Sequence, residues 1–184
     1  PEEVIYGLEE EIKLQELREA ESWQLLKGWE LQLYHNTLTL FASPTGNGKT
    51  LLTTQFLKNA IMADKKVVFF GNEENTATIY RRLKERFGAN QQKLLDALGS
   101  RQLRIICQTV CSQYKKLPLE VEKYLNYDVI IVDQLNYLQE SGDGSTDREL
   151  FIAIPAFLNK IKAMVNAPEQ CPAFICTQQM MTPD

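Results

Sequence analysis

The stretch "TLTLFASPTGNGKTLLTTQFLKNAIMA", residues 37–63, places a strand pattern, a glycine-rich loop and a helix pattern in immediate succession. The loop at residues 43–50 differs from the phosphate-binding pattern G-x-x-x-x-G-K-[ST] at one position, where Ser43 replaces the first glycine. A degenerate loop alone proves little. Its interpretation depends on what the rest of the chain supplies.

The residues of this loop have the chemistry that a bound phosphate requires. Gly46 and Gly48 allow the backbone N–H groups to wrap a phosphate, and the following helix adds its positive N-terminal end. Lys49 would reach the β- and γ-phosphates, and the Thr50 hydroxyl would bind Mg²⁺. Position 43 mainly has to be small. The predicted nucleotide-binding loop is Ser43, Pro44, Thr45, Gly46, Asn47, Gly48, Lys49 and Thr50. The alternative is a chance glycine turn, which the order of strand, loop and helix disfavours.

Strand and helix patterns alternate through the rest of the chain. Further strands are expected at 66–71, 103–107, 128–133 and 172–178. Helices are expected at 50–63, 77–87, 91–98, 119–125 and 147–165, the last with a kink at Pro155. Leu51, Phe56 and Ile61 are core candidates of the first helix. This order predicts an α/β domain with a mostly parallel sheet, in which ligands bind beyond the carboxyl ends of the strands.

Acidic residues follow two of these strands. Asp133 ends "VIIVD" and would hold Mg²⁺ through a water. Gln134 comes next, at the place where many P-loop ATPases carry the water-activating glutamate. "FFGNEEN" supplies Glu73 and Glu74 at the same sheet edge, and Glu73 would orient and deprotonate the attacking water. The alternative is that these acids cap the following helix, which suits Glu74 and Asn75 well.

The fifth expected strand ends in "TQQ", residues 177–179. A polar side chain at this edge can contact the γ-phosphate, and Thr177, Gln178 or Gln179 would serve. The alternative is an ordinary polar strand terminus.

Composition fits one globular domain and excludes few partners. The chain has 184 residues, 44% of them hydrophobic and 24% charged, with a net charge of −4. The absence of a basic excess argues against a simple DNA-binding module, but not against a ring that contacts one strand through a few loops. No apolar run reaches membrane-span length and no signal peptide opens the chain. Because the numbering starts at Pro1 without a Met, we expect a fragment.

The four cysteines do not indicate a metal site. The single histidine, His35, lies far in sequence from all four: Cys107, Cys111, Cys171 and Cys176. Reduced core thiols of an intracellular protein are therefore the better interpretation.

The N-terminal segment predicts a helix. Residues 2–27 show helical spacing and predict an amphipathic helix that packs on its own domain or docks on a neighbour. The expected division is an N-terminal helix at 1–28 and an ATPase core at 29–184.

Five motifs in order carry a family resemblance: "PTGNGKT", "FFGNEEN", "VIIVDQLNYLQ", "GDGSTDRE" and "FICTQQ". Together they resemble the RecA-like P-loop motor domain of ring-shaped replicative DNA helicases, such as the DnaB type, the phage primase-helicases and the mitochondrial Twinkle helicase. The resemblance runs from about Leu38 to Gln179. It implies a chain that uses ATP and Mg²⁺.

The resemblance also assigns roles to individual residues. It implies that Glu73, Lys49 and Gln178 are catalytic, with Gln178 the best match to the glutamine that senses the γ-phosphate. It places Arg82, beside Arg81, and Asp133 at the nucleotide, and Thr50 with Asp133 at the metal. The loop Ser141–Arg148 would face single-stranded DNA. Two lysines on the helix after it, Lys160 and Lys162, belong equally well to a solvated surface.

At the level of the whole protein the resemblance implies a DNA-unwinding hexamer with single-stranded DNA, and with a primase, polymerase or loader, as partners. The expected location is the cytoplasm of a bacterium or of a phage-infected cell; a mitochondrial nucleoid is the less favoured alternative. No association with a membrane is expected. The family places further strands, DNA loops and an arginine finger after the glutamine motif, beyond residue 184, so an isolated subunit would be a weak ATPase or none. The N-terminal helix resembles the family's linker helix.

Two other function classes share much of this pattern. One is a RecA- or KaiC-type ATPase of recombination or regulation. The other is a non-hydrolysing switch that only binds ATP, such as a loader.

Overall fold

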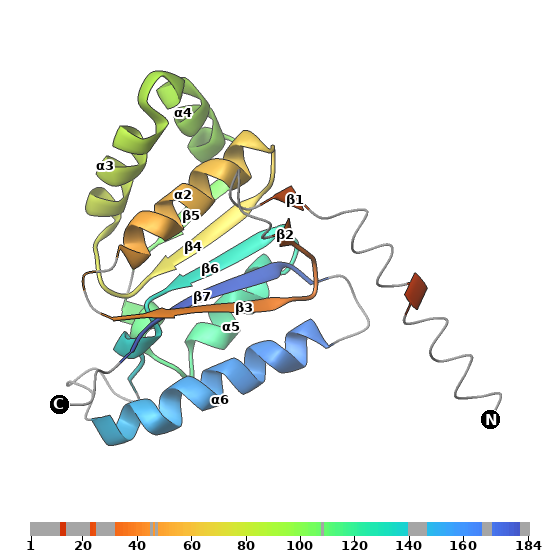
Figure 1. Ribbon diagram of the computed structural model, residues 1–184, viewed down its shortest axis with the longest axis vertical. Coiled ribbons are helices and arrows are strands. Elements are labelled where there is room, and N and C mark those ends of the chain that lie inside the picture. The colour runs from red at the N-terminus through yellow and green to blue at the C-terminus, as the bar shows by residue number, and fades with distance from the viewer. Residues whose placement is uncertain are drawn as a thin grey trace.

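A five-stranded parallel sheet forms the centre of the molecule (Figure 1). The computed structural model describes residues 12–13, 23–24, 32–44, 46, 48–107, 109–139, 147–166 and 171–180. The strands are β3 (Leu38–Ser43), β4 (Val67–Gly71), β5 (Leu103–Ile106), β6 (Val129–Asp133) and β7 (Ala173–Gln179). Their spatial order is β3-β7-β6-β4-β5, and every neighbouring pair is parallel. The predicted α/β fold class is confirmed.

Helices cover both faces of the sheet (Figure 1). One face carries α2 (Lys49–Met62), α3 (Thr76–Phe87) and α4 (Gln91–Gly99). The opposite face carries α5 (Leu117–Val121) and α6 (Asp147–Val165). Short 3₁₀ turns complete the connections: η1 (Gly88–Asn90), η2 (Thr109–Ser112), η3 (Glu122–Tyr124) and η4 (Leu135–Tyr137). The helices connect the strands, because the chain must return to the end of the sheet where the strands begin before it can start each new parallel strand.

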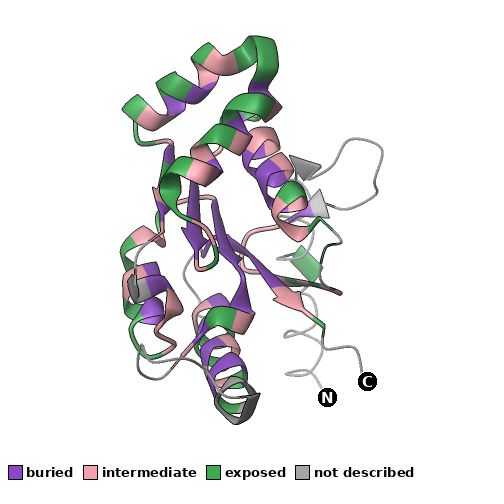
Figure 2. Cartoon of the chain, turned by 90° about the vertical axis from the view of Figure 1, so that its left-hand side faces the viewer, coloured by how far each residue is buried: buried purple, intermediate pink, exposed green. Residues whose placement is uncertain are grey.

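The core consists of two apolar layers, one on each side of the sheet (Figure 2). Side chains alternate across a strand, so Phe69 packs toward α2 while Phe70 packs toward α6. Every residue of β4 and β6 is buried, which explains their continuous apolar sequences. Phe56 on α2 and Phe157 on α6 are among the largest fully buried side chains of the two layers.

Most element boundaries agree with the sequence predictions, and two local details differ. Leu51, expected in the core, is 57% exposed because it lies on the outer face of α2, at helical spacing from Lys58 and the exposed Met62. The helix expected at 119–125 begins earlier, at Leu117, and ends at Val121 before the turn η3. Pro155 lies inside α6 and is exposed, and the helix continues on both sides of it.

The predicted N-terminal helix is wrong at its end. Ile12 and Lys13 are helical, but Trp23–Gln24 form a short strand, β1, that pairs antiparallel with β2 (Gln32–Leu33). Pairing with a partner strand overrides the modest helix propensity of these residues. The rest of segment 2–27 lies outside the described residues, and the division of the chain at residues 28 and 29 stays a prediction.

The four cysteines remain thiols, as expected, and three of them are buried: Cys111, Cys171 and Cys176. Burial raises the pKa of Cys171 to about 11 and that of Cys176 to about 12. Within the part of the chain that the structure describes, no helix is long and apolar enough to cross a membrane.

We predict that Phe56→Ala lowers the free energy of unfolding by about 3–5 kcal/mol, because it opens a cavity in a layer that cannot fully collapse. Phe56 is fully buried, and its ring lies 5.2 Å from that of Phe41. The matched control is Leu95→Ala on α4, where the side chain is 48% exposed; its effect should stay within about 0.5 kcal/mol. Urea unfolding measures both. Equal losses would contradict the assigned core.

Candidate active site

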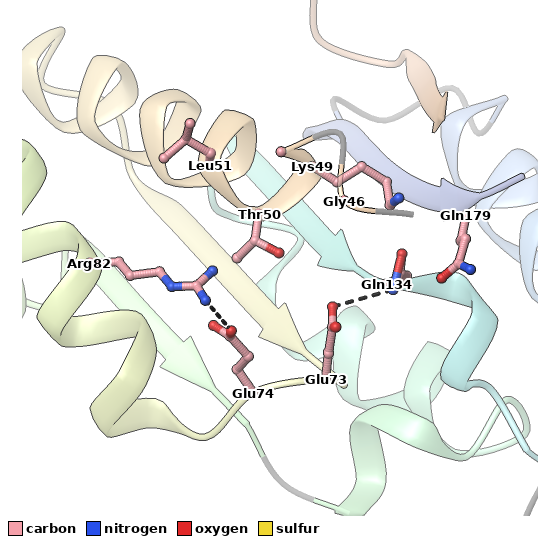
Figure 3. A pocket seen from close by; sticks show the side chains of 10 residues that line it. Gly46, Lys49, Thr50, Leu51, Glu73, Glu74, Arg82, Gln134 and Gln179 are labelled. Carbon is pink, nitrogen blue, oxygen red and sulfur yellow. Dashed lines mark hydrogen bonds and ion pairs between the residues drawn. The ribbon is translucent and has the colours of Figure 1, made fainter. Parts of the chain in front are cut away.

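A pocket lies beyond the carboxyl ends of the central strands, between the loop before α2 and the loop after β4 (Figure 3). Its volume is about 310 Å³, at the lower end of the range for small-molecule sites. The topology therefore puts the pocket where open α/β sheets bind ligands. The lining residues are Gly46, Gly48, Lys49, Thr50, Leu51, Glu73, Glu74, Arg82, Gln134 and Gln179.

The substitution at Ser43 does not disturb the loop. Among the loop residues that the structure describes, Gly46 and Gly48 have positive φ, 77° and 74°, a region that side chains rarely adopt. Ser43 ends strand β3 and has no such requirement. The two glycines that the loop needs are therefore present, and a serine fits at the strand end. Thr45 and Asn47 lie outside the described residues.

Lys49 and the start of α2 form the part of the pocket that is chemically suited to an anion. The Lys49 ammonium donates to the backbone carbonyls of Ser43 (3.1 Å) and Pro44 (2.9 Å). Gly48, the N-cap of α2, offers no side chain to the helix, and the described first turn contains no acidic residue. The N–H groups of this turn remain available to an anion, and the helix dipole favours negative charge there.

Asp133 is buried among threonine hydroxyls. Thr177 donates to its Oδ1, Thr53 donates to its Oδ2 over 3.4 Å, and the Thr50 hydroxyl also interacts with it. Burial raises the pKa of Asp133, while the bond from Thr177 opposes that rise. Mg²⁺ prefers oxygen ligands and usually keeps waters and substrate phosphates in its shell, so the oxygens of Thr50 and Asp133 fit this metal. These two predicted metal residues therefore lie together.

The pairing of β4 with β6 brings Glu73 to Gln134. Gly71 lies opposite Asp133 in the register, and the backbone N–H of Asn72 donates to the Asp133 carbonyl over 2.8 Å. One residue farther along, the Gln134 Nε2 donates to the Glu73 Oε2 over 3.3 Å (Figure 3). Gln134 is 3% exposed, whereas Glu73 is exposed at the pocket.

The two adjacent glutamates have different partners. Glu74 forms an ion pair with Arg82 from α3, and burial raises the pKa of Glu74 despite that guanidinium (Figure 3). The capping role falls to Asn75, whose side chain accepts from the Thr78 N–H over 2.9 Å. Glu73 is therefore the carboxylate that faces the pocket without a cationic partner in the described residues. Arg82 lines the pocket as predicted, and its neighbour Arg81 does not.

The glutamine at the end of β7 requires a correction. Gln179 lines the pocket, and Gln178, the predicted sensor, does not. The reason is strand alternation: Ile175, Thr177 and Gln179 share the face that carries α2, whereas Cys176 and Gln178 share the opposite face. Thr177 is buried against Asp133. Gln179 is fixed by Asn136, which donates to its carbonyl over 3.1 Å.

Sequence reasoning missed two side chains of the site. Gln134 was noted only because it is not a glutamate, and Tyr137 was not considered. Burial raises the pKa of Tyr137, and the nearby Glu73 charge adds to the rise; the Tyr137 hydroxyl interacts with both Glu73 and Gln134. The available signal was position: both residues directly follow strand β6, at the pocket edge.

Of the predicted DNA-contacting segment, Ser141–Arg148, the structure describes Asp147 and Arg148 alone. Residues 141–146 lie outside the described residues, so the assignment of Ser141–Arg148 stays a prediction. Lys160 and Lys162 on α6 are exposed, as either of their interpretations requires.

Comparisons with known proteins agree with this fold. The family model described as "ATPase: KaiC" matches residues 30–165, well over half of the chain. Among solved structures, a KaiC-like protein from the hyperthermophilic archaeon Pyrococcus horikoshii matches with a TM-score of 0.58 and 18% sequence identity, over 80% of this chain. This likeness concerns the fold, and the chain spans 63% of that protein. No curated protein matches the sequence at a significant level.

We predict that Lys49→Ala weakens ATP affinity about 10- to 100-fold, since it removes charge-assisted hydrogen bonds to the phosphates. Lys58→Ala is the matched control: Lys58 lies on the same helix and donates to a backbone carbonyl, that of Arg86, away from the pocket. Titration with a fluorescent ATP analogue measures both affinities. Equal affinities for the two variants would show that nucleotide does not bind at this loop.

Proposed function

We propose, from the premise that the chain belongs to the KaiC family of ATPases, that it hydrolyses ATP in this pocket with Glu73 as general base. The observation that carries the proposal is the register of β4 and β6, which places an exposed carboxylate opposite the phosphate-binding loop. A carboxylate in that position can accept the proton of a water that attacks the γ-phosphorus.

The other pocket residues supply binding and charge stabilisation. Lys49 and the N–H groups at the start of α2 would bind the β- and γ-phosphates, after the ammonium leaves the Ser43 and Pro44 carbonyls. Thr50 and Asp133 would hold Mg²⁺, which when bound neutralises charge on the phosphates. Gln179 would contact the γ-phosphate and register its loss. Arg82 would add positive charge to the site, in balance with Glu74.

The finer proposal is that hydrolysis drives the motor of a ring-shaped replicative DNA helicase. Its support is the ordered set of five motifs in the sequence, including "GDGSTDRE" before a long helix. Exposed residues such as Leu51 and Glu73 line the pocket, so a neighbouring subunit would be able to cover the nucleotide. A hexamer that translocates on single-stranded DNA, with a primase, polymerase or loader as further partner, follows from this proposal.

A second candidate is a KaiC-type ATPase of recombination or regulation. It is favoured by the family match and by the KaiC-like protein among the solved structures. Both candidates use the same hydrolytic site and differ in their response to DNA.

We predict that Glu73→Gln lowers steady-state ATP turnover by about 10²- to 10⁴-fold while ATP affinity stays the same, because the amide cannot accept the proton. Glu85→Gln, an exposed glutamate on α3, is the control and should turn over ATP like the wild type. Release of phosphate and binding of an ATP analogue are measured side by side. Unchanged turnover in Glu73→Gln would contradict the base assignment and favour a non-hydrolysing switch.

For the helicase proposal, we predict that single-stranded DNA stimulates ATP turnover of the full-length protein several-fold, and that added salt weakens the stimulation. The mass in solution with ATP should be that of a hexamer, and the protein should separate duplex strands. An ATP-dependent ring without a DNA response would favour the KaiC-type candidate. A monomer that ignores single-stranded DNA would contradict the helicase proposal.

A further inference from the structure

The residue directly after Asp133 is a buried amide, Gln134, at the position where many P-loop ATPases carry the catalytic glutamate. We propose that Gln134 is a positioning residue that holds the Glu73 carboxylate in place for water activation. The inference rests on the proposed function, because it takes Glu73 as the base. It also explains how the glutamate that follows β4 is oriented by the glutamine that follows the neighbouring strand β6.

Gln134 is held from two sides. Its side chain is 3% exposed, and its Nε2 donates to the Glu73 Oε2 over 3.3 Å. Its backbone carbonyl accepts from the Asn72 Nδ2 over 3.0 Å, so the backbone of position 134 is tied to the residue just before Glu73. A short path of two hydrogen bonds thus connects the end of β6 with the loop that carries the base.

The Gln134 side chain is poorly suited to a purely structural role. Its Oε1 is buried without a hydrogen-bond partner in the part of the chain that the structure describes. Burial of an unpartnered amide oxygen is unfavourable, and an apolar side chain of similar size would avoid it. The contact that an apolar residue could not make is the one with Glu73. We therefore infer that the Gln134 side-chain amide serves to orient Glu73 rather than to stabilise the fold.

The hydrogen bond from Gln134 restricts a side chain that is otherwise free to move. Glu73 sits on an exposed loop, where its side chain would otherwise sample several rotamers. The Gln134 donor limits that freedom. A displacement of about 1 Å in a catalytic group is enough to cost about 100-fold in rate.

The test is a double-mutant cycle on ATP turnover. Gln134→Leu is expected to lower kcat about 10- to 100-fold while KM for ATP stays the same and the unfolding midpoint does not fall. In the Glu73→Gln background, Gln134→Leu should have no further effect on turnover, because no carboxylate base remains to be positioned. The control is Gln102→Leu: the Gln102 side chain donates to the Lys65 carbonyl over 3.1 Å, away from the pocket, so the variant should lose stability and keep kcat.

A measurement without nucleotide tests the contact itself. The side-chain amide N–H resonances of Gln134 in the nucleotide-free chain should shift in Glu73→Gln and stay in place in Glu85→Gln. Unshifted resonances in Glu73→Gln would overturn the contact.

The cycle distinguishes failure of the proposed function from failure of the positioning role. If Glu73→Gln retains full turnover, the proposed function fails. If Glu73→Gln loses turnover while Gln134→Leu keeps it, the positioning role alone fails. An equal loss on adding Gln134→Leu to the wild type and to Glu73→Gln would likewise overturn it, because the amide would then act independently of the base.

Discussion

The pairing of β4 with β6 is the constraint on which the site depends. These two strands are neighbours at the centre of the sheet and far apart in sequence, and both are fully buried. Their register sets Gly71 opposite Asp133. A slip of one residue would move each side chain of one strand to the opposite apolar layer, where its packing partners differ, so close packing of the two layers fixes the alignment. The functional residues just beyond the strand ends inherit that alignment.

Several separate features follow from this alignment. Asp133 ends its strand on the face of α2, where threonines from α2 and β7 surround it. Glu73 lies past the end of β4, beside Gln134 and across the pocket from the phosphate-binding loop. Gly71 is part of the same arrangement, since a Cβ there would lie 2.8 Å from the sulfur of Cys107, which directly follows β5. In the proposed function, Glu73 takes the role of the glutamate that is absent after Asp133.

Features governed by local pattern were predictable from the sequence. The periodicity of apolar residues predicts the strands and the helices that cover them. Ligand-binding residues are expected at the carboxyl ends of parallel strands, which identifies Lys49, Thr50 and the acidic residues after two strands. The structure places these residues at one end of the sheet. Features that depend on which way a side chain faces were not. Gln178 and Gln179 lie on opposite faces of the sheet, and the end of β7 has no alternation of apolar and polar residues from which the face of each could be predicted. Leu51 is a leucine in a helix next to the core, and only the rotation of α2 against the sheet turns it outward. Trp23–Gln24 fit a helix by composition, and their pairing with Gln32–Leu33 makes them a strand.

In the proposed function, Glu73 and the loop before α2 face the same γ-phosphate. A crystal structure of the protein with a non-hydrolysable ATP analogue and Mg²⁺ would show whether they do. We expect the Lys49 ammonium to leave the Ser43 and Pro44 carbonyls for the phosphates, and an ordered water to bridge the Glu73 carboxylate and the γ-phosphate. A γ-phosphate that faces away from Glu73, or a nucleotide bound elsewhere on the chain, would contradict it.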